Sequence, residues 1–98
     1  MKIKDLTQSK VCEYMKLDYS ELDVEEVALL NGAMDAALAY IVGYTGLEKD
    51  RVEEMDDMSI AYLCIIQDMY DNRALQIDKN TLNKTISTIL DMHSVNLL

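Results

Sequence analysis

The longest regular pattern of apolar and polar positions runs from Leu22 to Leu47 and predicts one long helix. Apolar side chains recur along it at alternating steps of three and four residues, which places them on one face of a helix. These residues are Val27, Leu30, Met34, Ala37, Ile41 and Tyr44. A second row beside them consists of Leu29, Ala33, Ala36 and Tyr40. Because two apolar rows need neighbours on more than one side, we expect this helix to be the centre of the fold.

Both ends of the predicted central helix carry capping residues. Asp23 precedes the helix and Glu26 follows three residues later, which is the spacing of a capping box. Gly46 stands at the other end, where a residue without a Cβ adopts the left-handed backbone that ends many helices. The middle is rich in alanine and contains Gly32, so its small side chains leave room for a closely packed helix from the same chain or from a second subunit.

Shorter helical patterns flank the central helix. Thr7 is the predicted cap of a short helix that ends near Lys16, and acidic residues gather in the connection 17–22. The segment 48–57 carries six acids and two bases, and we expect a loop or one or two helical turns there. Asp56 is the predicted cap of the helix that follows.

That next helix is predicted to continue to Tyr70, because helical spacing persists beyond its apolar centre. Its two apolar rows are Met58, Tyr62, Ile65 and Met69, and Ile60, Leu63, Ile66 and Tyr70. Residues 73–82 are expected to form a loop or a short hairpin. Asn83 then caps a last helix that carries Ile86, Ile89, Leu90 and His93, and the tail 94–98 is apolar enough to dock on the rest. The pattern predicts one all-α domain over residues 1–98, with four to five helices around a long central one.

Composition and charge narrow the classes of function. The 98 residues include no proline, no tryptophan and three glycines, which favours helices over turn-rich β architecture. The net charge of −9 repels phosphate backbones, so we expect no direct grip on nucleic acid. The longest uninterrupted apolar run, Ile60 to Ile66, is too short to span a bilayer, and no membrane association is predicted.

Candidate catalytic or metal-binding chemistry is sparse in the sequence. His93 is the only histidine, and no nucleophile, base and orienting group stand together in a catalytic pattern, so we predict no enzyme and no cofactor. Asp18, Ser20 and Glu21 resemble the start of a calcium loop, but Leu22 stands where an oxygen ligand is required, so no metal site is predicted. The acids of 48–57 are interpreted as a solvated surface, and the two cysteines and the methionine stripes as core.

Four short motifs are spaced along most of the chain. They are Asp5-Leu6-Thr7 with Tyr14-Met15-Lys16-Leu17-Asp18, then Tyr40-Ile41-Val42-Gly43-Tyr44-Thr45-Gly46, Tyr70-Asp71-Asn72-Arg73 and Leu82-Asn83-Lys84-Thr85-Ile86. In this order and spacing the sequence resembles the small head-to-tail connector, or adaptor, proteins of long-tailed bacteriophages and prophages. It departs from them at Lys84, where relatives often have proline, and at Leu90-Asp91-Met92-His93, where they end in Gln-Leu-Arg-Gly.

The resemblance implies a structural subunit of the virion rather than an enzyme. Such subunits pack into a ring of about a dozen copies between the portal protein and the tail-side completion protein. DNA passes through the ring during packaging and ejection without specific binding. The implied location is the neck of the virion, and the host cytoplasm during assembly. The candidate subunit interface combines the second row of the central helix with the loop after Asn72, and consists of Leu29, Ala33, Ala36, Tyr40, Arg73, Leu75 and Ile77.

A second hypothesis from another class is a small acidic regulator or DNA mimic that binds one basic partner and forms no ring. The two hypotheses differ in where the acids lie. A DNA mimic would gather its carboxylates in one stripe, whereas a connector needs apolar surface between its subunits.

Overall fold

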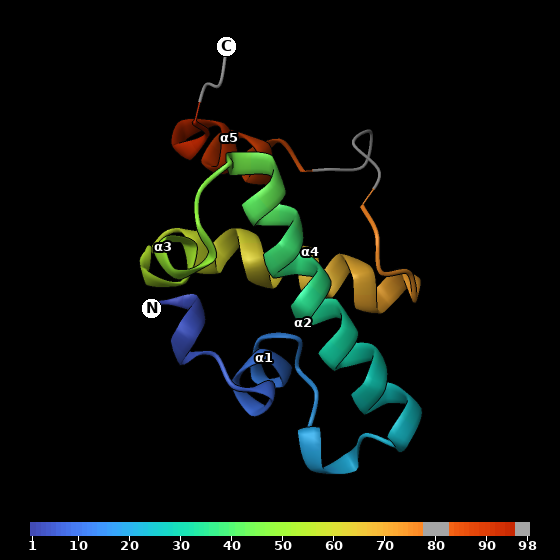
Figure 1. The fold of residues 1–98 in the computed structure, drawn as a ribbon. Coiled ribbons are helices and arrows are strands. Elements are labelled where there is room, and N and C mark those ends of the chain that lie inside the picture. Colours follow the sequence, from blue (N-terminus) through green and yellow to red (C-terminus); the bar gives the residue numbers. More distant parts are fainter. Residues whose placement is uncertain (78–82, 96–98) are drawn as a thin grey trace.

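The computed structural model describes residues 1–77 and 83–95, and within them the chain is helical with no strand (Figure 1). Five α-helices are present in this part: α1 (Gln8–Tyr14), α2 (Val24–Thr45), α3 (Lys49–Glu54), α4 (Met58–Asn72) and α5 (Lys84–His93). Two short 3₁₀ helices, η1 (Ile3–Asp5) and η2 (Tyr19–Glu21), precede α1 and α2. The prediction of an all-α bundle around one long central helix is confirmed.

The caps predicted from the sequence hold the ends of α2. The Asp23 carboxylate accepts a hydrogen bond from the Glu26 amide at 2.8 Å, and the Glu26 carboxylate accepts one from the Asp23 amide at 3.4 Å. Gly46 has the left-handed φ of 73° and donates its N–H to the Val42 carbonyl at 2.9 Å. Thr7 and Asn83 also cap α1 and α5, as predicted.

Replacing Asp23 by alanine should lower the free energy of unfolding by about 1 kcal/mol, because the Glu26 amide loses its acceptor. Chemical denaturation monitored by circular dichroism measures this change. Asp35→Ala is the matched control, because Asp35 is an exposed residue in the middle of the same helix. A loss of stability of the same size in the control would contradict the capping role of Asp23.

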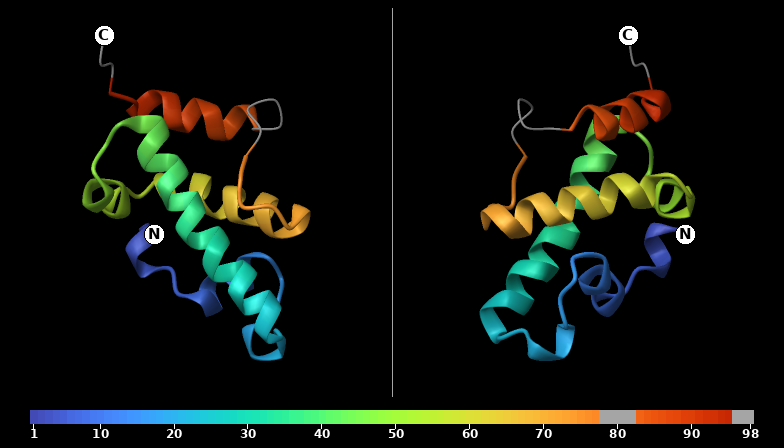
Figure 2. Two further views of the ribbon diagram at one scale, coloured as in Figure 1. Left: turned by 45° about the vertical axis from the view of Figure 1, so that its right-hand side comes forward. Right: turned by 180° about the vertical axis from the view of Figure 1, so that it is seen from behind.

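The core forms where α2 crosses α4, and the oblique view and the view from behind agree on this crossing (Figure 2). The buried stripe of α2 consists of Leu30, Ala33, Ala37, Ile41 and Thr45. It lies between the two rows that the sequence suggested, so Val27, Met34 and Tyr44 from the first predicted row are only half-buried. Nearly all of both predicted rows of α4 are buried; Ile60 is the exception, with 54% of its surface exposed.

The predicted cap of α4 is wrong. The helix begins at Met58, Asp57 occupies the N-cap position, and neither carboxylate caps the helix. The Asp56 carboxylate lies 3.9 Å from the amino group of Met1, while its backbone carbonyl accepts a bond from the Ser59 hydroxyl at 2.9 Å. The Asp57 carboxylate lies 2.5 Å from Nε2 of His93, which ties the end of α5 to the start of α4.

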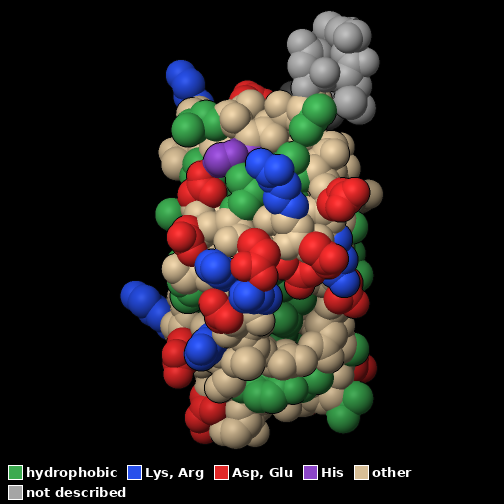
Figure 3. Space-filling view, turned by 60° about the vertical axis from the view of Figure 1, so that its left-hand side comes forward, with side chains coloured by type: hydrophobic (Ala, Val, Ile, Leu, Met, Phe, Trp, Pro, Cys, Tyr) green, Lys and Arg blue, Asp and Glu red, His purple; other side chains and the backbone are tan. Residues whose placement is uncertain are grey.

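The acidic segment 48–57 takes the helical form of its two predicted alternatives, as α3. Val52 on this helix is fully buried, so the segment is anchored in the core. The Glu54 carboxylate pairs with the ammonium groups of Lys2 and Lys4 at 3.2 and 2.6 Å, and these bonds lower the pKa of Glu54. On this face acidic and basic side chains are interspersed, and the histidine lies among them (Figure 3). The prediction that the acids of 48–57 form only a solvated surface is therefore incomplete, because this surface also joins η1 to α3.

The tail is docked as far as Val95, whose N–H donates to the Thr45 carbonyl at 2.7 Å. This bond links the second residue after α5 to the last residue of α2. The prediction of a loop or hairpin over 73–82 falls partly outside the described residues, since only its portion up to Ile77 lies within them. The predicted docking of the tail beyond Val95 also lies outside them.

Candidate functional site on the outer face of α2

The side of α2 that is turned away from α4 is weakly polar and built mainly from small side chains. Its exposed residues, here called the outer face of α2, are Ala28, Asn31, Asp35, Ala39 and Gly43. Asp35 is the only charged residue between Val27 and Thr45. At one edge, Asn31 accepts a hydrogen bond from the Gln8 amide group of α1 at 3.3 Å. Apart from Asn31 and Asp35, this surface therefore presents alanine and glycine to its surroundings.

Two open hollows lie on either side of Ala39. One has a volume of about 550 Å³ and is lined by Ala39, Tyr40, Gly43 and Tyr44. The other measures about 320 Å³ and is lined by Asp35, Leu38, Ala39, Val42 and Lys49. They form because small residues stand between bulkier ones: a Cβ placed on Gly43 would meet no atom within 4 Å. The relief of this face, with ridges beside hollows, is suited to receiving side chains from another molecule.

The first hollow has two tyrosines on its wall. Their rings lie 6.0 Å apart with an interplanar angle of 42°. The Tyr44 hydroxyl donates to the Asp91 carboxylate at 2.5 Å, and this bond raises the pKa of Tyr44 to about 12. The Tyr40 hydroxyl is buried and has no hydrogen-bond partner within the part of the chain that the structure describes. A buried hydroxyl without a partner costs about 1–3 kcal/mol of stability.

The predicted interface residues divide into three groups by burial. Ala33 is fully buried in its own chain, so it must be removed from the predicted surface. Leu29, Ala36, Tyr40 and Ile77 are half-buried and pack against the core, whereas Arg73 and Leu75 are exposed. The structure does bring the two predicted parts together, because a Cβ added to Gly32 would lie 2.9 Å from the Leu75 side chain. The second row is thus partly covered by the chain's own segment after α4.

The outer face was missed by the sequence reasoning because its residues are neither apolar in a continuous row nor chemically distinctive. Ala39 and Gly43 contribute almost no side chain, and Asp35 interrupts the apolar pattern. The signal in the sequence that could have indicated this face was the alanine-rich composition of the helix together with Gly32. Which side of the helix these small residues would leave free depends on where α4 and Leu75 pack.

The remaining reactive side chains do not form a catalytic constellation in the described residues. Cys12 is buried, and the Cys64 thiol lies 3.5 Å from the Tyr14 hydroxyl. His93 pairs with Asp57 and no nucleophile adjoins them in the described hydrogen bonds. Within residues 1–77 and 83–95 no three His, Cys, Asp or Glu side chains are grouped as metal ligands would be.

The length and composition of α2 would allow it to cross a membrane, and it is the one helix of the described chain for which this holds. The core helix of a soluble protein passes the same test, so the finding has little weight by itself. Most of the larger apolar side chains of α2 outside its buried stripe are half-buried and pack against the core.

Comparison of the chain with known proteins assigns it to no family. No family model matches the sequence, and neither a curated protein nor a solved structure matches it. A proposal about its function therefore rests on the outer face of α2, the distribution of charge and the motifs of the sequence.

Proposed function

We propose that this chain is a head-to-tail connector subunit, which assembles with copies of itself into a ring through which phage DNA passes. The observation that carries the proposal is the outer face of α2, a stripe of small residues beside two hollows. From Ala28 to Gly43 this stripe extends over about 23 Å, at 1.5 Å per residue. A face of this kind is stabilised when a neighbouring subunit covers it, because small residues let another helix approach closely.

The motifs that resemble connector proteins fall at structurally defined positions. Tyr40 to Gly46 forms the last turns of α2 and contributes Gly43 to the outer face. Tyr70 to Arg73 ends α4, where Arg73 has the left-handed φ of 51°. Asp5 to Thr7 leads into α1, with Leu6 buried and Thr7 as the cap. Because these motifs lie at or near the ends of helices in a single fold, their positions support the proposal that they belong to one helical family.

The charge of the chain is compatible with a channel for DNA. A net charge of −9 on every subunit gives a ring that repels the phosphate backbone, so DNA slides through without being held. In the proposed virion the ring lies in the neck, in contact with the portal protein on one side and the tail-side completion protein on the other. Assembly takes place in the host cytoplasm, and no membrane is involved.

The distribution of acids favours the connector over an acidic regulator or DNA mimic. Acidic side chains near α3 alternate with basic ones, as in the pairs of Glu54 with Lys2 and Lys4 (Figure 3). The outer face of α2 carries the single charge of Asp35. A mimic would need a continuous row of carboxylates to imitate phosphates, whereas the surface around Glu54 is mixed in charge and the outer face of α2 is weakly charged.

Light scattering over a series of protein and salt concentrations tests this proposal. We expect monomers in dilute solution at about 0.1 M salt, where the Debye length is about 10 Å and the acidic subunits repel one another. Raising the salt to about 1 M shortens that length to about 3 Å and should produce larger oligomers. Electron micrographs of the concentrated sample distinguish a closed ring from an open filament.

A pair of variants locates the contact. Ala39→Arg places a long charged side chain on the outer face and should abolish association, because the hollows beside Ala39 are then blocked. Ser9→Arg adds the same charge at an exposed position of α1 and should associate like the wild type. A fixed monomer or dimer up to millimolar concentration, together with no recruitment by a cognate portal protein, would show that the proposal is wrong.

A further inference from the structure

The outer face of α2 is overlapped at one place by the chain itself. Gly32 points in the same direction as this face, because Ala39 and Gly43 follow it after seven and eleven residues, spacings within about 20° of whole helical turns. Ala39 and Gly43 are exposed, whereas Gly32 is half-buried. A Cβ built on Gly32 would lie 2.9 Å from one methyl group of Leu75 and 3.5 Å from the other. Leu75 therefore rests in the notch that this glycine leaves.

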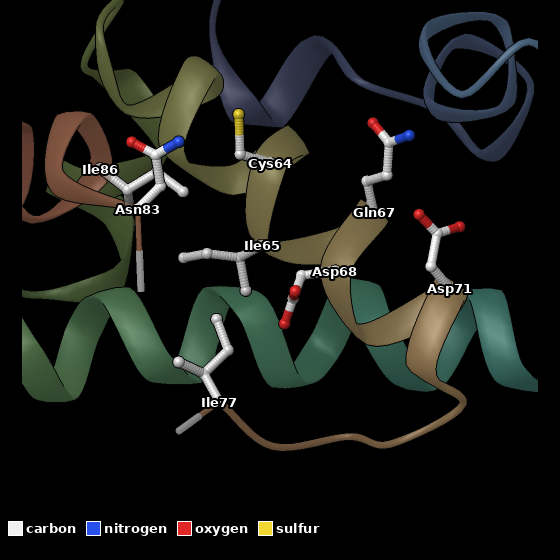
Figure 4. A pocket seen from close by; sticks show the side chains of 8 residues that line it. All are labelled: Cys64, Ile65, Gln67, Asp68, Asp71, Ile77, Asn83 and Ile86. Carbon is white, nitrogen blue, oxygen red and sulfur yellow. The ribbon is translucent and has the colours of Figure 1, made fainter. Parts of the chain in front are cut away.

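Residues 73–77, here called the strap, carry Leu75 to α2. The strap begins where α4 ends, at Arg73, whose left-handed φ of 51° turns the chain back. It reaches Ile77, which is half-buried and faces Ile65 of α4 across a cavity of about 310 Å³ beside α4 (Figure 4). Both ends of the strap are thus attached to α4 or face it, and its middle residue lies on α2.

The seat of Leu75 on α2 is shallow, and few other contacts hold the strap. The Leu75 side chain remains 49% exposed. Among the described residues, the backbone hydrogen bonds of the strap are confined to Arg73 and Ala74, which donate to carbonyls near the end of α4 at 3.3 and 3.1 Å. Segments with few buried contacts and few backbone bonds open at a low cost in free energy. These are the properties of a segment that lifts from α2 while the core stays folded.

We propose that the strap is an autoinhibitory contact, in which Leu75 occupies the notch that a side chain of a neighbouring subunit fills in the ring. This inference rests on the proposed function, because it requires that the outer face of α2 receives a second subunit. A helix laid along this face from Ala28 to Gly43 would meet Leu75 at Gly32, so the strap must lift first. The strap thereby adds to the charge repulsion that keeps dilute subunits apart.

This role is the opposite of the one that the sequence predicted for Leu75. An interface residue strengthens association, so its truncation weakens binding. An autoinhibitory residue competes with the neighbouring subunit, so its truncation enlarges the fraction of chains that are ready to bind and raises the apparent affinity. The sign of the effect therefore distinguishes the two roles.

Light scattering of the full chain carrying Leu75→Ala, at about 1 M salt, tests this inference. We expect half-maximal association at about a tenfold lower protein concentration than in the wild type, as for a strap that is seated in about nine-tenths of the free chains. Ile60→Ala is the matched control, because it shortens an aliphatic side chain of similar exposure, 54%, on α4. The control should associate like the wild type.

Nuclear magnetic resonance of leucine methyl groups in dilute samples shows separately whether the strap leaves α2. Gly32→Ala places a methyl group in the notch, and the flexible end of Leu75 moves away from it. We expect the Leu75 resonances to shift toward those of an unstructured chain. Gly43→Ala makes the same change on the same helix where a Cβ meets no atom within 4 Å, and it should leave these resonances in place.

The outcomes separate the strap from the ring. If the wild type associates and Leu75→Ala associates equally or more weakly, the strap inference is wrong and the ring proposal stands. Tighter association of Ile60→Ala, to the same degree as Leu75→Ala, would also overturn the strap. No association of either the wild type or Leu75→Ala up to millimolar concentration would overturn both proposals. Unchanged Leu75 resonances in Gly32→Ala would show that Leu75 does not sit in the notch.

Discussion

Replacing Ile41 by aspartate should unfold the domain. Ile41 is fully buried in the stripe of α2 that packs against α4, and no basic side chain lies in that stripe. A carboxylate placed there would lose its hydration without gaining a partner, at a cost of several kcal/mol. A domain of this size is stable by about 5–15 kcal/mol, so the loss removes much of its stability. Ala37→Arg, at another fully buried position of the same stripe, should have a similar effect.

Thermal unfolding followed by circular dichroism measures this prediction. Ile60→Asp is the matched control, because it makes the same change in α4 at a position that is 54% exposed. We expect the control to melt within a few degrees of the wild type, since surface substitutions usually change stability by less than about 0.5 kcal/mol. A cooperative melt of Ile41→Asp at the wild-type temperature would contradict the described core.

Raising the pH from about 10 to about 12 should also remove much of the stability of the fold. Burial of Tyr62 raises its pKa to about 12, with smaller effects from the charges of Asp35 and Glu53. An unfolded chain loses the same proton at a pKa of about 10. Between these values the unfolded state binds fewer protons than the native state, so stability is fully present below pH 10 and falls as the pH rises through 12. For Tyr62 this difference corresponds to at most about 3 kcal/mol.

Denaturation curves at several pH values up to 12 measure this fall. Tyr62→Phe should make it shallower, because phenylalanine has no proton to lose. Tyr44 should add a further decrease over the same range, since its hydrogen bond to Asp91 also raises its pKa to about 12. An equally steep fall in Tyr62→Phe and in the wild type would contradict the assigned role of Tyr62.

The features that the sequence predicted well are those with short-range causes. The caps at Thr7, Asp23, Gly46 and Asn83 depend on atoms no more than four residues away, so the residue types alone indicate them. The apolar rows predicted the existence of α2 and α4 for the same reason, because helical spacing is a local property.

The features that were missed depend on how elements pack. Ala33 belongs to the core because α4 packs across α2, and Thr45 lies where the chain after α5 returns to the end of α2; no local pattern specifies either contact. The Asp57 carboxylate meets a histidine that lies 36 residues away in the sequence, which spacing rules do not reveal. The cavity beside α4 likewise joins residues of α4, the segment after it and α5. For the candidate interface, the sequence predicted the correct helix, α2. It did not predict which side of that helix the rest of the chain leaves uncovered.

The bond between the Val95 amide and the Thr45 carbonyl affects how the chain folds as it is synthesised. Synthesis proceeds from the N-terminus, so α2 is complete about 50 residues before its last carbonyl can receive this donor. During that interval the Thr45 side chain already serves the end of the helix, because its hydroxyl donates to the Ile41 carbonyl and accepts from the Leu47 amide. The hydrogen bonds at the C-terminal end of α2 therefore form in two stages. The bonds of Thr45 with Ile41 and Leu47 come first, and the bond from Val95 follows once α5 has been synthesised.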